Sequence, residues 1–130
     1  LYTANTVKVI EGYKNYVAVD GGMCDNPRFA LYKSSYTVIA ADKAEEKCDF
    51  NCSLVGRFCE SGDVIQANVK LPSSVKRGDL IAVLTTGAYD YSMASNYNRI
   101  PRLPVVMLNG NNDYVAVKRE SLDDIVRNDV

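Results

Sequence analysis

Residues 58–63, FCESGD, place a cysteine and a glutamate side by side at the end of a strand-like segment. Neighbouring side chains on a regular strand point to opposite faces, so Cys59 and Glu60 can address one ligand only where the strand breaks. Ser61-Gly62 supplies such a break. A cysteine thiol of pKa about 8.5 is mostly protonated at pH 7 and can donate a proton, while a carboxylate can bind an ammonium group. The pair therefore suits acid catalysis, and a buried structural cysteine beside a surface glutamate is the alternative.

A second set of candidate residues lies in MCDNPRFALY (23–32). Asn26 can cap a short helical turn that has Pro27 at its first position. Such a turn would put Arg28 and Tyr32, which are four residues apart, on one face. A guanidinium and a phenol placed there can bind one small anion, such as a carboxylate. The alternative is a surface arginine beside a core tyrosine.

A third candidate, Tyr89, lies near the start of GAYDYSMASNYNRIPR (87–102). This segment is rich in Asn, Ser and Tyr, and it has little core character. A stretch of this length without an apolar pattern is unusual in a compact domain, which predicts a functional loop. Tyr89 can hold a phosphate or a substrate group there, and a ring that only packs is the alternative.

The elements that must position these residues are mostly strands. Apolar alternation predicts strands at 6–10, 15–20, 36–42, 52–58, 63–71, 79–86, 105–108 and 113–119. Asn109-Gly110 suits a tight hairpin turn between the last two. Ser121 is a candidate cap for a C-terminal helix over 121–130. The sequence thus predicts an all-β fold, a Greek-key-type antiparallel barrel or sandwich with short helical turns and a C-terminal helix.

Composition limits the class of protein. The 130 residues are 47% apolar and 24% charged, which fits one globular domain over 1–130. A net charge of −1 offers no basic field for nucleic acid or for a membrane surface. No apolar run is long enough to cross a bilayer, and no signal pattern opens the chain. Cys48-x-x-x-Cys52 is not a zinc spacing and histidine is absent, so we expect no metal site and four free, cytosolic thiols.

Four stretches of the chain resemble the C-terminal domain of diaminopimelate decarboxylases, in the group that also contains ornithine and arginine decarboxylases. CESGD preceded by G-x-x, together with GAYxYSMASNYN, is specific to this family. The ornithine branch carries Cys-Asp at the equivalent place and lacks the long Ser-Met-Ala-Ser-Asn loop. The matching stretches are VDGGMCDNPRFALY (19–32), GRFCESGDVI (56–65), GDLIAVLTTGAYDYSMASNYNRIPR (78–102) and VVML to VKRESLDDIVRND (105–129).

The resemblance implies a pyridoxal 5′-phosphate enzyme that converts meso-2,6-diaminopimelate to L-lysine and CO2 in lysine biosynthesis. Cys59 falls on the family's catalytic acid, which returns a proton to the α-carbon. Glu60 falls on the residue that binds the distal ammonium of the substrate. Arg28 and Tyr32 would hold its carboxylate, and Tyr89 would contact both substrate and cofactor.

The resemblance also implies that this domain works as part of a larger, cytoplasmic, homodimeric enzyme. The cofactor lysine and the phosphate loop belong to an N-terminal (β/α)₈ barrel outside this chain, and the family's sheet domain borrows a strand from the N-terminus. Cys59 and Glu60 would act across the dimer interface, so we expect the chain alone to be inactive. Two alternatives stay open: decarboxylation of another substrate, such as carboxynorspermidine or arginine, and a non-catalytic β module that binds a partner.

Overall fold

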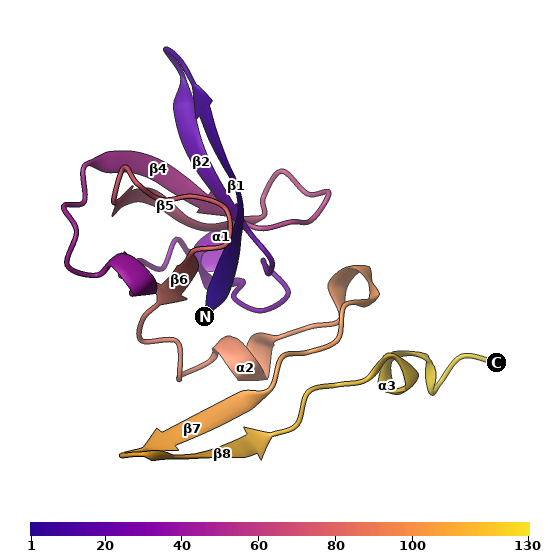
Figure 1. Ribbon diagram of the computed structural model, residues 1–130. Coiled ribbons are helices and arrows are strands. Elements are labelled where there is room, and N and C mark those ends of the chain that lie inside the picture. Colours follow the sequence, from indigo (N-terminus) through magenta and orange to yellow (C-terminus); the bar gives the residue numbers. More distant parts are fainter.

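The computed structural model describes all residues from 1 to 130, and strands dominate it (Figure 1). Each strand is short, as expected for alternating segments that are separated by Gly and Pro turns. The strands are β1 (Tyr2–Ile10), β2 (Lys14–Val19), β3 (Val38–Ala40), β4 (Phe50–Val55), β5 (Val64–Leu71), β6 (Leu80–Val83), β7 (Val105–Asn109) and β8 (Asn112–Val117). The helices are α1 (Arg28–Tyr32), α2 (Asp90–Met93) and α3 (Leu122–Val126), with 3₁₀ turns η1 (Ala41–Lys43) and η2 (Tyr97–Arg99).

Six strands form one sheet in the order β3-β6-β1-β2-β4-β5. Its two edges come together where the Tyr36 backbone N–H, just before β3, donates to the Gln66 side chain of β5 at 2.8 Å. The sheet is therefore nearly closed, and the predicted all-β, barrel-like fold is confirmed. One pair departs from the antiparallel prediction: β2 and β4 run parallel, with Tyr16 opposite Ser53. The connection between them contains α1, β3 and η1. It is long enough to return the chain to the end of the sheet where β2 begins, as parallel neighbours require.

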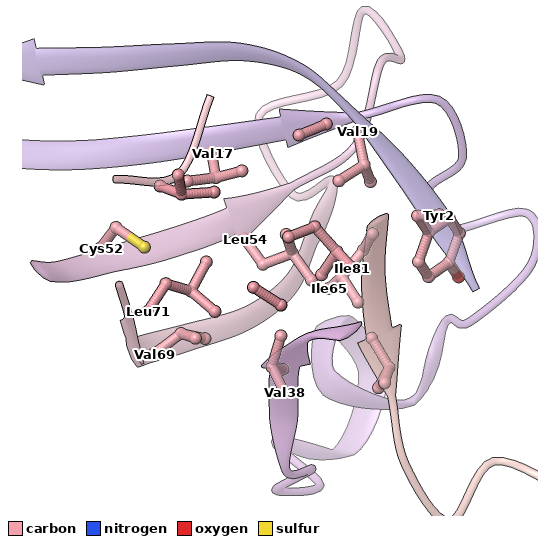
Figure 2. Packing of buried hydrophobic residues seen from close by; sticks show 14 residues of the cluster. Tyr2, Val17, Val19, Val38, Cys52, Leu54, Ile65, Val69, Leu71 and Ile81 are labelled. Atoms are coloured by element: carbon pink, nitrogen blue, oxygen red, sulfur yellow. The ribbon is translucent and has the colours of Figure 1, made fainter. Parts of the chain in front are cut away.

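The inner face of this sheet carries the hydrophobic core. Fourteen buried side chains pack together there, and Figure 2 shows them converging from all six strands. Leu54 of β4, Ile65 and Leu71 of β5 and Ile81 of β6 are each fully buried. Alternate residues of a strand point to the same face, so the alternation in the sequence places these side chains inside.

Several element boundaries differ from the sequence-based predictions. Strand β1 begins at Tyr2 rather than at residue 6, because buried Tyr2 pairs with Ile81 of β6. The segment 87–102 is not one irregular loop, because it forms α2 and η2. Helix α3 is shorter than 121–130, but the predicted cap is confirmed: the Asp124 backbone N–H donates to Ser121 Oγ, and the Ser121 N–H donates to the Asp124 carboxylate.

Strands β7 and β8 form a separate hairpin that lies apart from the barrel-like sheet (Figure 1). The predicted turn is present, and Gly110 adopts φ +62° within it, in the left-handed region that glycine tolerates. Helix α3 follows the hairpin and carries the C-terminus away from the sheet (Figure 1). None of the helices is both long and apolar enough to span a membrane.

Candidate functional site

Arg28 is the first residue of α1, which the loop after β2 positions. The Asn26 side chain accepts a hydrogen bond from the Arg28 backbone N–H at 3.3 Å, as a capping residue would. Pro27 sits at the N-cap, one position earlier than predicted. Within this single helical turn the Arg28 guanidinium carbon lies 5.5 Å from the centre of the Tyr32 ring. The predicted spacing therefore brings Arg28 and Tyr32 together.

Tyr89 reaches the same guanidinium from a segment far along the chain. The Arg28 guanidinium carbon lies 4.8 Å from the centre of the Tyr89 ring, within range of a cation–π interaction. Tyr89 has φ +73°, an unusual backbone conformation for a bulky residue, at the start of α2. Such conformations often occur at functional sites. We call Arg28, Tyr32 and Tyr89 the Arg28 cluster.

The Arg28 cluster faces solvent. Tyr32 is 62% exposed and Tyr89 is 64% exposed, so neither is a core residue, and the alternative of a core tyrosine beside Arg28 is wrong. Arg28 forms no ion pair with any carboxylate of the chain; its guanidinium contacts Met93 Sδ at 3.9 Å and lies near enough to the Tyr36 hydroxyl to oppose the rise that burial causes in the Tyr36 pKa. An arginine without a carboxylate partner, between two exposed phenols, is suited to bind an anion.

A buried acid lies behind the cluster. Asp90 is 5% exposed, and its carboxylate accepts a hydrogen bond from the Tyr36 hydroxyl at 3.4 Å. Burial raises the pKa of Asp90, while the Tyr36 hydroxyl and the positive charge of Arg28 oppose this shift. Asp90 therefore adds negative charge near Arg28 without pairing with it directly.

Cys59 and Glu60 lie in the turn between β4 and β5, which we call the Cys59 turn (residues 58–62). Cys59 is exposed, so the alternative of a structural core cysteine is wrong. Glu60 Oε1 accepts hydrogen bonds from the Gly62 backbone N–H at 2.8 Å and from the Ser61 hydroxyl at 3.4 Å. Its other carboxylate oxygen has no hydrogen-bond partner in the chain. The turn at Ser61-Gly62 is present as predicted, but the strand before it is shorter than 52–58, because β4 ends at Val55 and leaves Cys59 and Glu60 inside the connection to β5.

Within one chain, no hydrogen bond or ring contact joins Cys59 or Glu60 to the Arg28 cluster. The Cys59 turn instead contacts neighbouring loops: the Phe58 ring packs edge-on against Tyr97 at 5.6 Å. Sequence reasoning missed one residue, the buried Asp63, which links the Cys59 turn to the loop before α1 through hydrogen bonds from Phe58 and Met23. Its signal in the sequence was its place as the last residue of CESGD.

The other three cysteines do not belong to the site. All four thiols are free, with Cys24 and Cys52 buried and Cys48 exposed. Burial, followed by the nearby Asp25 carboxylate, raises the pKa of Cys24 to about 12, and burial alone raises that of Cys52 to about 11. Both buried thiols therefore stay protonated at neutral pH, as expected of inert core cysteines.

Comparison with known protein families shows which family the chain belongs to. Residues 1–87 match the model of the pyridoxal-dependent decarboxylase C-terminal sheet domain. The chain belongs to this pyridoxal-dependent decarboxylase family. The family resemblance inferred from sequence motifs is thus confirmed, and the matched region contains Arg28, Tyr32, Cys59 and Glu60 but ends just before Tyr89.

Individual relatives agree with the family assignment. The chain is 50% identical to diaminopimelate decarboxylase of Bacillus subtilis over its whole length, and 46% identical to that of Staphylococcus aureus over 99% of it. The solved structure of diaminopimelate decarboxylase from M. jannaschii in complex with L-lysine superposes with a TM-score of 0.89, at 29% identity over 99% of the chain. The Helicobacter pylori enzyme with L-lysine gives 0.84, at 35% identity over 97%.

This pyridoxal-dependent decarboxylase domain is one part of what those relatives contain. The chain covers 29% of the Bacillus subtilis protein and 30% of the Staphylococcus aureus protein. It likewise covers 29% and 30% of the two solved chains. The activity of a whole enzyme therefore needs a separate argument.

Proposed function

We propose that the whole protein decarboxylates meso-2,6-diaminopimelate to L-lysine, and that this chain supplies its substrate-binding residues and its catalytic acid. The observation that carries the proposal is the Arg28 cluster, where an unpaired guanidinium lies between two exposed tyrosines. The names of the similar proteins, and the L-lysine in two of the similar structures, support this substrate.

In this proposal the Arg28 cluster binds the distal carboxylate of the substrate. The guanidinium offers several N–H donors and the Tyr32 phenol offers another, and a carboxylate can accept from both. A substrate without that carboxylate leaves the Arg28 charge unpaired in a closed site, which is costly. The cluster thus selects substrates with a second amino acid end.

Glu60 recognises the same distal end of the substrate, because its negative charge suits the distal ammonium group. One of its carboxylate oxygens is held by the Cys59 turn, and the other is free to accept a hydrogen bond from the distal ammonium. A pair of opposite charges at the far end of the substrate distinguishes diaminopimelate from amino acids with a single charged end. Ornithine, for example, would leave Arg28 without a partner.

The donors of the Arg28 cluster also fit a pyridoxal phosphate beside the substrate, because the Tyr89 phenol can donate to a phosphate oxygen. Bound pyridoxal phosphate would take up the electron pair that remains when CO2 leaves. Cys59 would donate its thiol proton to the α-carbon, which forms the C–H bond that replaces the bond to CO2. The lysine that attaches the cofactor belongs to the N-terminal barrel domain of the whole enzyme.

We further propose that two copies of the enzyme share each site. Cys59 and Glu60 make no contact with the Arg28 cluster of their own chain, which is consistent with their serving the site of a second subunit. The complete enzyme would then be a cytoplasmic homodimer in which each site needs both copies. The N-terminal strand of the family's sheet domain would complete the barrel-like sheet.

The test of the catalytic acid is Cys59→Ala in the full-length enzyme, with Cys48→Ala as the control because Cys48 is also exposed. We expect Cys59→Ala to lower kcat by about 100-fold or more, since a general acid contributes about that much. KM should change by less than about threefold, because the thiol acts in the chemical step. Wild-type kcat in Cys59→Ala would remove the assigned role.

The test of the substrate is a comparison of CO2 release from diaminopimelate, carboxynorspermidine and arginine by the full-length protein. We expect release from diaminopimelate alone. Release from either of the others, with none from diaminopimelate, would show that the substrate is wrong. Release from none of them would favour the non-catalytic module instead.

A further inference from the structure

Asp63 is a buried acid at the point where two loops meet. It is 4% exposed, and it lies at the end of CESGD, just before β5. Its Oδ1 accepts a hydrogen bond from the Met23 backbone N–H at 2.7 Å, and its Oδ2 accepts one from the Phe58 backbone N–H at 2.9 Å. One carboxylate therefore joins the loop that leads into α1 to the first residue of the Cys59 turn.

Two glycines make room for this carboxylate. A Cβ added to Gly22 would lie 2.6 Å from Asp63 Oδ1, and a Cβ on Gly56 would overlap the same carboxylate. The backbone at Gly22 and at Gly56 lies so close to the Asp63 carboxylate that neither position has room for a Cβ atom. The close packing, with a hydrogen bond to each loop, shows that the carboxylate fits between them with little freedom.

Further contacts fix the loops around Asp63. The Arg57 backbone N–H donates to the Gly21 carbonyl at 3.1 Å, and the Gly56 N–H donates to the Asp63 carbonyl at 2.9 Å. The Ser95 N–H donates to the Cys24 carbonyl at 2.9 Å, which ties the segment after α2 to the same loop. Displacement of Asp63 would thus disturb the turn that carries Cys59 and the loop that leads into α1, where Arg28 lies.

No lysine or arginine forms an ion pair with Asp63, so the two backbone N–H groups are its main polar partners. Burial raises the pKa of Asp63, and the charges of Asp25 and Glu60 add to the shift, while the N–H groups of Phe58 and Met23 oppose it. Burial of a carboxylate without such hydrogen bonds costs free energy of folding. The two N–H groups therefore offset the cost of burying Asp63.

We propose that Asp63 is a positioning residue that holds the Cys59 turn against the loop 21–25 and thereby sets the location of the Cys59 thiol during catalysis. The proposal rests on the decarboxylase function proposed above. Asp63 does not contact the substrate. Its effect on the reaction passes through Cys59.

The test variant is Asp63→Asn in the full-length enzyme. Asparagine keeps one acceptor oxygen, but its NH2 group would face the second backbone N–H, so one of the two loops loses its bond. The matched control is Asp79→Asn. Asp79 is also 4% exposed, and it accepts hydrogen bonds from the Lys76 backbone N–H at 2.8 Å and from Lys43 Nζ, away from both loops.

We expect Asp63→Asn to lower kcat about tenfold or more in the wild-type background, but less than about twofold in a Cys59→Ala background, because a residue that acts through Cys59 is not additive with its loss. Asp79→Asn should leave kcat within about twofold in both backgrounds. An equal loss from Asp63→Asn in the two backgrounds would overturn the proposal. A loss of kcat in Asp79→Asn as large as that in Asp63→Asn would also overturn it, because general destabilisation would then explain both.

Hydrogen exchange of the same proteins tests the structural half of the proposal without any assay of activity. Exchange at the Met23 or the Phe58 amide, whichever loses its acceptor in Asp63→Asn, should be about tenfold faster or more, and exchange at both amides should be unchanged in Asp79→Asn. Unchanged exchange in Asp63→Asn would overturn the proposal even if the enzyme is active. If the wild-type protein lacks decarboxylase activity, the proposed function fails, but hydrogen exchange still tests whether Asp63 holds the Cys59 turn against the loop 21–25.

Should Asp63→Asn not fold, Gly56→Ala takes its place in both measurements, because the added Cβ displaces the same carboxylate.

Discussion

At the scale of single residues, the proposed site rests on a positive charge that no carboxylate of the chain neutralises. Arg28 lies between two tyrosine rings and has no carboxylate within ion-pair distance. The buried Asp90 behind it bonds to Tyr36 instead. An arginine held in this way keeps its donors available for a ligand, and little reorganisation is needed when the ligand binds.

Replacement of Arg28 by Ala in the full-length enzyme should chiefly weaken substrate binding. A hydrogen bond to a charged group contributes about 1.5–3 kcal/mol, so we expect KM for diaminopimelate to rise by roughly 10- to 100-fold. Steady-state kinetics would measure this. The control is Arg77→Ala, an exposed arginine without an ion pair, which should leave KM unchanged. An unchanged KM in Arg28→Ala would count against the carboxylate assignment.

At the scale of elements, one acid fastens the segment after α2 to the end of the hairpin. Glu120, which follows β8, accepts hydrogen bonds from the Asn96 side chain at 2.6 Å, from the Arg102 backbone N–H at 2.8 Å and from Arg102 Nη1 at 3.4 Å. The Arg102 N–H and the Asn96 amide hold the pKa of Glu120 below its ordinary value. The segment that carries Tyr89 is thus held from its far end.

The contribution of Glu120 to stability should depend on pH. A carboxylate with a lowered pKa in the folded state stabilises the fold above its unfolded pKa of 4.5, and the effect is lost as the pH falls through the folded value. We expect Glu120→Gln to lower the free energy of unfolding by about 1 kcal/mol at pH 7, with a smaller difference from wild type below pH 4.5. Urea unfolding at several pH values measures this. Glu11→Gln, in the exposed turn after β1, is the control, and a difference independent of pH would contradict the expectation.

At the scale of the whole molecule, the core belongs to the six-stranded sheet, with Val75 of the β5–β6 connection added to it. The β7–β8 hairpin stands apart from it in Figure 1, with most of its side chains exposed. Its exposed apolar residues are Val106, Met107, Leu108, Tyr114 and Val115. A two-stranded hairpin with both faces in water is only marginally stable, so the two parts of the chain differ in stability.

Hydrogen exchange of this chain should reveal that difference. Amides of β7 and β8 should exchange about 100-fold faster or more than those of β4 and β5, because few buried contacts oppose opening of the hairpin. The β4–β5 pair holds the fully buried Leu54 and Ile65 and serves as the internal reference. Equal protection of the two pairs would mean that the hairpin is packed as firmly as the sheet.

Local sequence pattern determined much of this protein. Alternation of apolar residues fixed the strands, since period two is a property of neighbouring residues. The four-residue spacing of Arg28 and Tyr32 likewise determined that they meet on α1. The specific stretches CESGD and GAYxYSMASNYN were enough to identify the family.

Only the tertiary structure decided which distant segments come together. The parallel pairing of β2 with β4, the contact between Arg28 and Tyr89, and the bonds from Asp63 to Met23 and Phe58 join residues that no local pattern relates. Periodicity states which face a residue occupies, but it does not state what lies opposite that face. A buried carboxylate therefore looks like any surface acid in the sequence, and its partners are known only when the chain has packed around it.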